Sequence, residues 1–260
     1  MGCLAGKVAI VTGASGGLGR AFAMEMAADG AKVVGTGRNV ERGEKTVSLI
    51  KEKGGEAIFL PTDVTKEAAW QEVMDRTLQT YGRLDSVINN AGDSILKPLE
   101  DLTLDDLQFL LQLNLEGSFL GTKAAMQTMG PEGGCVINVT VLSALGGNLH
   151  STAYSAAKGA LSHFTRAAAL AGAPRNVRVN NIVPGVLFPK GELPEGATRV
   201  HGGRKGAQIF VDMIIAKTPL KRIGDPPDVG RAAVYLCSDA ARMVTGIDMI
   251  VDGGRMARAP

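Results

Sequence analysis

The sequence predicts an α/β fold, a doubly wound parallel sheet that forms a single domain over residues 1–260. Three observations predict it. Short β-branched runs alternate with longer helical patterns along the chain, as in strand–helix–strand units. These runs are continuously apolar, which is typical of parallel strands with both faces covered by helices. The first run leads directly into a glycine-rich turn, and a helical pattern follows that turn.

We expect seven strands, each a short apolar stretch. Helical patterns separate them, for example those that begin near Arg20, Ala68 and Ala153. No internal repeat and no linker interrupts the alternation, so one domain is expected. The expected strands cover residues 7–12, 31–36, 56–60, 84–89, 135–141, 177–183 and 248–252.

Composition and charge exclude several classes of protein. With 45% hydrophobic and 21% charged residues, the chain is expected to be globular and soluble. A net charge of +2 is too balanced for a nucleic-acid partner or an anionic membrane surface. No apolar run approaches the roughly 20 residues of a membrane helix, and no signal peptide is evident. We therefore expect a cytoplasmic protein without a metal or disulfide framework, because the three cysteines are widely spaced: Cys3, Cys135 and Cys237.

The glycine-rich turn after the first strand is suited to a dinucleotide phosphate. Gly13 permits a tight turn, Gly17 leaves room for a pyrophosphate, and Gly19 lets the helix and strand pack closely. The helix N-terminus offers free N–H groups to the anion. The strand before the turn and the helix after it supply the structural context that the motif requires. The alternative is an ordinary glycine-rich turn between a strand and a helix. This Rossmann-type loop predicts contacts to a dinucleotide from Gly13, Ser15, Gly16, Gly17, Leu18 and Gly19.

The end of the second strand favours NADP(H) over NAD(H). An acidic residue there would bind the ribose 2′-hydroxyl of NAD, whereas a basic residue would pair with the 2′-phosphate of NADP. Residues 35–39 read Gly-Thr-Gly-Arg-Asn and contain no carboxylate. Arg38 is placed to bind a phosphate. The alternative is that Arg38 is a solvated residue at the start of a helix.

One segment breaks the alternation of strands and helices. It follows Pro184 and Gly185 and is rich in glycine, proline and charge. Because ligands of open α/β sheets bind beyond the carboxyl ends of the strands, we expect residues of about 186–217 to cover a substrate. The alternative is a plain surface excursion.

Several motifs together resemble the short-chain dehydrogenase/reductase family, over nearly the whole chain. The resemblance implies a ketoreductase-like enzyme with a small-molecule substrate, and a homotetramer. The motifs are TGASGGLG (12–19), DV (63–64), NNAG (89–92), LNLEGSF (113–119), YSAAK (154–158), PG (184–185) and the closing segment 218–254. The resemblance implies further cofactor contacts from Asp63, Val64, Asn90, Ala91, Gly92, Thr140, Tyr154, Lys158, Pro184, Gly185 and Val186.

Tyr154 and Lys158 form the predicted proton-transfer pair. The ordinary pKa of tyrosine, near 10, is too high for efficient acid–base chemistry at neutral pH. Lys158 lies one helical turn later, and its ammonium is expected to lower that pKa. The resemblance implies that Lys158 also holds the nicotinamide ribose, and that Asn114 supports a water that links the lysine to solvent.

One part of the expected site departs from the family. The family has a serine that donates a hydrogen bond to the substrate oxygen. When the chain is aligned to the family without gaps between Asn138 and Tyr154, Val141 occupies the position of that serine, and its side chain cannot donate a hydrogen bond. Thr140 should face the opposite side of the strand. Ser143 lies beyond the strand and is our preferred replacement, although a site without any such donor is the open alternative. His150 is a third candidate.

A second departure follows Pro184 and Gly185. The family often has a threonine near the nicotinamide carboxamide, whereas this chain reads Val-Leu-Phe-Pro, so backbone contact from Val186 is the expected substitute. The apolar residues of this region suggest a hydrophobic, cyclic or aromatic substrate. Two alternatives remain: recruitment to cyclisation, isomerisation or imine reduction, and a protein that binds NADP(H) without turnover. The apolar residues are Leu142, Leu145, Leu149, Leu187 and Phe188.

Overall fold

The computed structural model describes residues 2–188 and 202–257, and it confirms the predicted fold. Seven parallel strands form one sheet in the order β3-β2-β1-β4-β5-β6-β7. The order reverses direction between β1 and β4, which is the point where doubly wound sheets bind their ligands. The strands are β1 Val8–Thr12, β2 Lys32–Gly37, β3 Glu56–Pro61, β4 Ser86–Asn89, β5 Gly134–Val139, β6 Val177–Pro184 and β7 Asp248–Val251.

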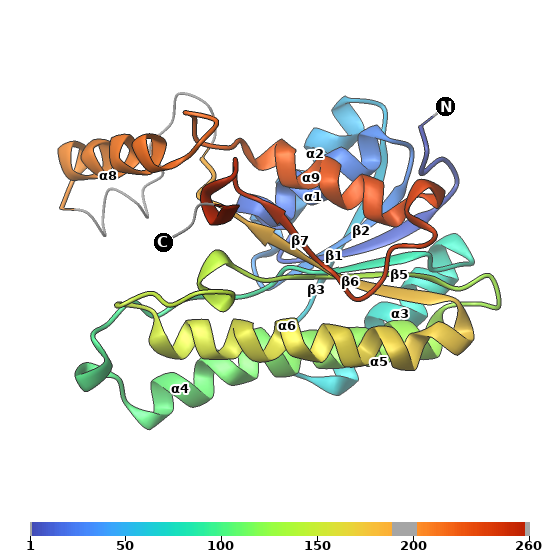
Figure 1. The fold of residues 1–260 in the computed structure, drawn as a ribbon. Coiled ribbons are helices and arrows are strands. Elements are labelled where there is room, and N and C mark those ends of the chain that lie inside the picture. The colour runs from blue at the N-terminus through green and yellow to red at the C-terminus, as the bar shows by residue number, and fades with distance from the viewer. Residues whose placement is uncertain (1, 189–201, 258–260) are drawn as a thin grey trace.

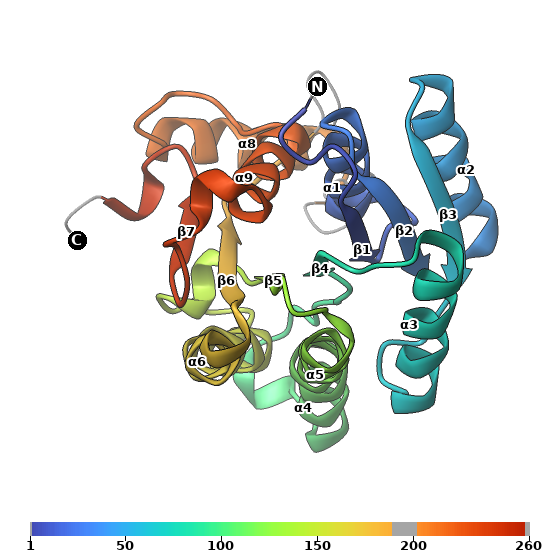
Figure 2. The same ribbon diagram turned by 90° about the vertical axis from the view of Figure 1, so that its right-hand side faces the viewer.

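Helices cover both faces of the sheet (Figures 1 and 2). α1, α2 and α9 pack on one face, and α3, α4, α5 and α6 pack on the other. This arrangement explains the apolar strands, because every residue of β1 is buried. The helices are α1 Gly17–Ala28, α2 Val40–Glu52, α3 Glu67–Tyr81, α4 Leu104–Leu111, α5 Gly117–Thr128, α6 Thr152–Gly172, α8 Arg204–Lys217 and α9 Pro226–Cys237.

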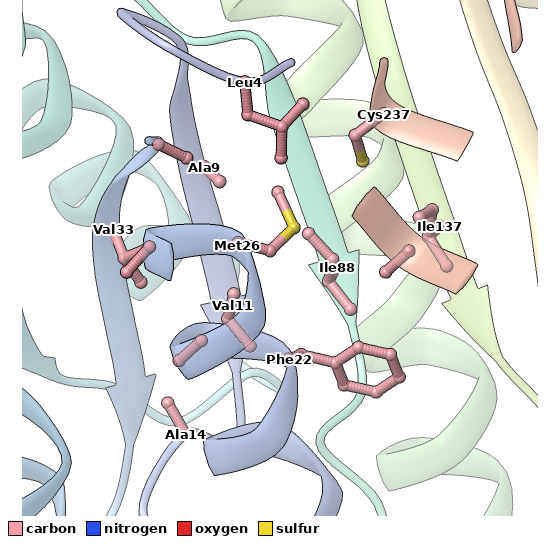
Figure 3. Close-up of a cluster of buried hydrophobic side chains, with 14 of the residues drawn as sticks. Leu4, Ala9, Val11, Ala14, Phe22, Met26, Val33, Ile88, Ile137 and Cys237 are labelled. Atoms are coloured by element: carbon pink, nitrogen blue, oxygen red, sulfur yellow. The ribbon is translucent and has the colours of Figure 1, made fainter. Parts of the chain in front are cut away.

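The hydrophobic core between α1, α9 and the sheet holds the glycine-rich loop in place. Phe22 and Met26 of α1 lie against Val11 and Ile88, and all four side chains are essentially inaccessible to solvent (Figure 3). Ala14, in the loop itself, belongs to the same cluster. Close packing of this kind fixes the position at which helix α1 begins.

A chain of buried hydrogen bonds joins the sheet to α6. Asn89 Nδ2 donates to Asn138 Oδ1 (2.9 Å), and Asn138 Nδ2 donates to Thr165 Oγ1 (2.8 Å). The Thr165 hydroxyl lies 2.7 Å from Asn181 Oδ1. Buried polar groups need such partners, and a network of these bonds favours one arrangement of the elements that it joins. The network therefore fixes α6, the helix that carries Tyr154, against β5 and β6.

The segment after β6 differs in part from the irregular loop that its composition predicts. Residues 204–217 form helix α8, with Ala207 and Ile214 buried on one face. In Figure 1 this helix stands to one side of the sheet. The helix forms because apolar residues recur there at helical spacing. Residues 189–201 lie outside the described residues, so the substrate-covering role of residues 186–217 stays a prediction.

Helix α1 also differs from its prediction, because it begins at Gly17 rather than near Arg20. The last glycines of the loop thus belong to the first turn of the helix. Within residues 2–188 and 202–257, no helix is long and apolar enough to span a bilayer.

Candidate active site

The glycine-rich loop adopts the backbone shape that the sequence predicts. Gly13 and Gly17 have φ angles of 69° and 53°, in the left-handed region that favours glycine. A Cβ atom on Gly17 would meet no atom within 4 Å, so the space above it is open. A Cβ on Gly19 would lie 2.1 Å from the carbonyl oxygen of Gly13, which only glycine avoids. The loop therefore leaves room for an anion at the start of α1.

A cavity of about 820 Å³ lies beside this loop, beyond the ends of β2 and β3. It has the size and position for the adenosine half of a dinucleotide. Arg38 is exposed at its rim. Phe109, Gln112 and Leu113 line it as well. The predicted cofactor residues that line it are Gly13, Ser15, Gly16, Arg38, Asp63, Val64, Ala91 and Gly92.

Asp63 lines the same cavity, and its carboxylate is stabilised in the charged form. Hydrogen bonds from Thr65, first from its backbone N–H and then from its hydroxyl, lower the pKa of Asp63. The positive charges of Lys66 and Arg38 lower it further. The carboxylate is thus a fixed acceptor for a neutral donor such as an adenine amino group.

Arg42 is a second cation at this cavity, which sequence reasoning missed. It follows the Asn39 cap, whose side-chain oxygen accepts a hydrogen bond from Arg42 N (2.9 Å). One guanidinium nitrogen of Arg42 lies 2.6 Å from the position of a Cβ on Gly16. The position of Arg42 in the first turn of α2, just after Arg38, was the sequence feature that could have indicated this role. Two guanidinium groups and no carboxylate at the end of β2 suit a 2′-phosphate better than a 2′-hydroxyl.

A smaller cavity, of about 370 Å³, continues from the loop toward α6. Tyr154 and Lys158 both line it, so the structure brings the predicted pair to the glycine-rich loop. The predicted residues Thr140 and Asn90 also line it. Asp93 and Ser94, which sequence reasoning missed, also line it, and the available signal was their position directly after the Asn-Asn-Ala-Gly motif. Further predicted residues along it are Gly13, Gly16, Leu18, Gly19, Ala91 and Gly92.

Lys158 is buried and held by the sheet. Its side chain is 3% exposed, and Nζ donates a hydrogen bond to the carbonyl oxygen of Val139 at 2.8 Å. Nζ lies 6.0 Å from the centre of the Tyr154 ring. Burial lowers the pKa of Lys158 from 10.5 to about 8, so the amine is still mainly protonated at pH 7.

The expectation that Lys158 lowers the pKa of Tyr154 is wrong for this structure. Burial raises the pKa of Tyr154 to about 12, and the negative charge of Asp93 raises it further. Desolvation opposes the charged phenolate more strongly than a lysine 6.0 Å from the ring centre favours it. The phenol is therefore protonated at neutral pH, which is the form that a proton donor needs.

Asn114 lies beneath this cavity, in a π-helical turn that spans Gln112–Glu116. Its Nδ2 donates to the carbonyl oxygens of Asp93 and Leu110, both at 3.0 Å. Its Oδ1 is buried and accepts no hydrogen bond from the described residues. A Cβ on Gly92 would lie 2.5 Å from Asn114 Oδ1 and 3.4 Å from Lys158 Nζ. A polar group between asparagine and lysine would satisfy that oxygen, which fits the predicted water.

The structure places the candidates for the missing hydroxyl as follows. β5 ends at Val139, two residues earlier than predicted, because Leu142–Ala144 form a 3₁₀ turn. The Thr140 hydroxyl donates to the carbonyl oxygen of Ile182 (3.3 Å), so it is already used. Ser143 lies in the 3₁₀ turn and lines neither cavity of the glycine-rich loop. The turn packs against α6, the helix that carries Tyr154. Ser143 as the substrate donor stays a prediction.

The remaining predicted residues line neither cavity beside the glycine-rich loop. His150 is exposed on the loop before α6. Gly185 N donates to the carbonyl oxygen of Val251, and Val186 lines a separate cavity of about 230 Å³ with Arg222. Pro184, Gly185 and Val186 thus border neither of the two cavities beside the glycine-rich loop, and their contact with a cofactor stays a prediction.

The sheet order, the phosphate-binding loop and the tyrosine–lysine pair define a dinucleotide-binding α/β oxidoreductase. A family model described as enoyl-(acyl carrier protein) reductase matches residues 13–255. The chain belongs to the short-chain dehydrogenase/reductase family, as its motifs indicate.

Relatives match this chain over nearly its full length. It is 37% identical to the NADP-dependent (R)-specific alcohol dehydrogenase of Lentilactobacillus kefiri, over 98% of each chain. It is 36% identical to a cyclopentanol dehydrogenase of Comamonas sp. (strain NCIMB 9872), over 99% of this chain and 100% of that one. A crystal structure of a putative short-chain alcohol dehydrogenase from Sinorhizobium meliloti 1021 has a TM-score of 0.89, 34% identity and 98% coverage of each chain.

Proposed function

We propose that the protein reduces a carbonyl group of a hydrophobic, cyclic or aromatic small molecule with NADPH, with Tyr154 as the proton donor. One observation carries the proposal: Tyr154 and Lys158 line the cavity that opens from the glycine-rich loop. Bound NADPH would supply the hydride to the carbonyl carbon. Tyr154 gives its phenolic proton to the oxygen that becomes negative as the carbonyl is reduced. Alcohol oxidation uses the same groups in reverse.

The surrounding residues support this division of roles. Tyr154 is protonated at neutral pH because burial raises its pKa to about 12, so it starts a reduction in the correct form. Lys158 is positioned by Val139 and holds the nicotinamide ribose in the proposed complex. Asn114 Oδ1 anchors the water that returns a proton toward the pair. The position of that oxygen below Gly92 supports this role.

The preference for NADPH is supported by charge. Arg38 and Arg42 both border the larger cavity, and residues 35–39 contribute no carboxylate to offset them. A 2′-phosphate would receive charge-assisted hydrogen bonds from either guanidinium. The NADP dependence in the name of the Lentilactobacillus relative agrees with this choice.

The substrate class is supported by apolar residues and by one relative. Leu142 and Leu145 stand on the turn just before α6, and Leu145 is 36% exposed. Leu187, in contrast, packs into the core against Gly224. The Comamonas relative is named for a cyclic alcohol. A homotetramer, implied by family resemblance, remains part of the proposal.

NADPH consumption at 340 nm with a panel of cyclic and aromatic ketones tests the function. We expect turnover with at least one ketone and a loss of about 10²–10⁴-fold in kcat for Tyr154→Phe, the usual contribution of a general acid. Tyr235→Phe, which alters a 41% exposed tyrosine on α9, is the matched control. Turnover that survives in Tyr154→Phe contradicts the proposed donor. NADPH binding without turnover of any carbonyl favours a non-catalytic binder or another reaction.

A further inference from the structure

The cavity that contains Tyr154 also contains a carboxylate that the proposed reaction does not use. Asp93 directly follows Gly92, is exposed and lines this cavity beside Ser94. Its backbone carbonyl oxygen accepts a hydrogen bond from Asn114 Nδ2 (3.0 Å), and its Oδ1 accepts one from Ser94 N (2.8 Å). Both ends of the residue are therefore held in place.

The charge of Asp93 is not neutralised by a direct ion pair. Among residues 2–188 and 202–257, no lysine, arginine or histidine lies within ion-pair distance of its carboxylate. Among the described residues, Lys158 is the one cationic residue that lines the same cavity, and its ammonium is buried against the carbonyl oxygen of Val139. The phenol of Tyr154 responds to the carboxylate, because the charge of Asp93 contributes to its raised pKa. A substrate whose carbonyl oxygen reaches Tyr154 would lie in the field of the same charge.

The negative charge of Asp93 bears directly on the proposed reduction. Reduction places negative charge on the carbonyl oxygen, and a nearby carboxylate opposes this charge. At the position where the family resemblance implies a serine donor for this oxygen, the chain has Val141. A positive charge on the substrate would relieve the repulsion and pair with the carboxylate.

We propose that Asp93 is a specificity-determining residue that selects carbonyl compounds carrying a cationic nitrogen over neutral compounds of the same shape, and rejects anionic ones. This inference rests on the proposed carbonyl reduction. Asp93 acts on the substrate as a charge and takes no part in hydride or proton transfer.

Two ketones of equal shape test the inference, one with a trimethylammonium group and one with a tert-butyl group at the same position. The readout is the ratio of their kcat/KM values with NADPH. We expect the wild-type protein to favour the cationic ketone, and Asp93→Asn to lower the ratio by about fivefold to tenfold, the effect of one unit charge several ångströms away in a partly solvated site. This substitution keeps a side-chain oxygen that can accept the hydrogen bond from Ser94 N. Asp93→Lys should reverse the order, so that a ketone with a carboxylate is favoured.

Asp75→Asn is the matched control, because it removes the same charge from the exposed face of α3. It should leave the ratio unchanged. A wild-type protein without preference for the cationic ketone overturns the inference, as does a ratio that stays within twofold in Asp93→Asn.

Calorimetric binding of the same two compounds to the NADPH-loaded protein separates this inference from the proposed function. A cationic preference in binding that disappears in Asp93→Asn, without turnover of either compound, supports the role of Asp93 and counts against carbonyl reduction. Absence of both turnover and binding preference overturns the role of Asp93.

Discussion

Replacing Lys158 with methionine should stabilise the folded protein at neutral pH while it disables the site. The side chain is 3% exposed, and burial lowers its pKa from 10.5 to about 8. At about 1.4 kcal/mol for each pH unit, this drop corresponds to a cost of about 3 kcal/mol for burying the charged amine. Methionine has similar length and no charge, so Lys158→Met removes that cost.

The sign of the effect follows from the two pKa values. Below pH 8 the amine is protonated in both states, and folding carries the full cost. Between pH 8 and 10.5 the unfolded chain still binds the proton that the folded chain has released, so stability rises with pH. The methionine variant lacks this rise. It also loses the hydrogen bond to Val139, worth about 1 kcal/mol at any pH.

We therefore expect Lys158→Met to be about 2 kcal/mol more stable than the wild type at pH 7 and to lose this advantage by about pH 10. Urea denaturation without nucleotide, at one protein concentration and several pH values, measures the difference. Lys45→Met, which changes an exposed lysine on α2, is the matched control and should show no such pH dependence. A variant that is less stable at pH 7, with a difference that is constant with pH, refutes the reasoning.

Three further predictions address the cofactor, the core and the asparagine. Arg38→Gln should weaken NADPH binding by about tenfold and NADH binding by less than about threefold in fluorescence titrations, with exposed Arg76→Gln as control; equal losses would contradict a phosphate contact. Thr165→Val should cost about 2–3 kcal/mol in urea denaturation, because it leaves the buried Nδ2 of Asn138 and Oδ1 of Asn181 without their Thr165 partner; a change below about 0.5 kcal/mol would show that the network relaxes. Gly92→Ala should lower kcat by a larger factor than it raises the NADPH Kd, because its Cβ would lie 2.5 Å from Asn114 Oδ1; unchanged kcat would remove that oxygen from the reaction.

Local sequence patterns were sufficient to predict the strands and the loop that joins β1 to α1. The central strands β1 and β4 are short apolar runs, and burial on both faces requires that composition. The left-handed φ angles at Gly13 and Gly17 follow from residue type, because glycine accommodates them without strain. The start of α8 was not predicted, because glycine and charge at 202–206 mask the helical spacing that follows.

The electrostatic properties of the site could be found only from the tertiary structure. The spacing of Tyr154 and Lys158 indicated a shared helix face but gave no measure of burial, and burial reverses the expected pKa change of the phenol. Arg42 reaches the Gly16 loop from another helix, and Asp93 acts on Tyr154 although the two residues are far apart in the chain.

By itself, the sequence determined the fold class, the family and the glycine-rich loop, because periodicity and motif spacing are properties of the chain. Only the tertiary structure decided which side chains share a cavity and which charges act on each other. Coulomb and desolvation energies depend on distances and solvent exposure in three dimensions, and the order of residues along the chain contains neither.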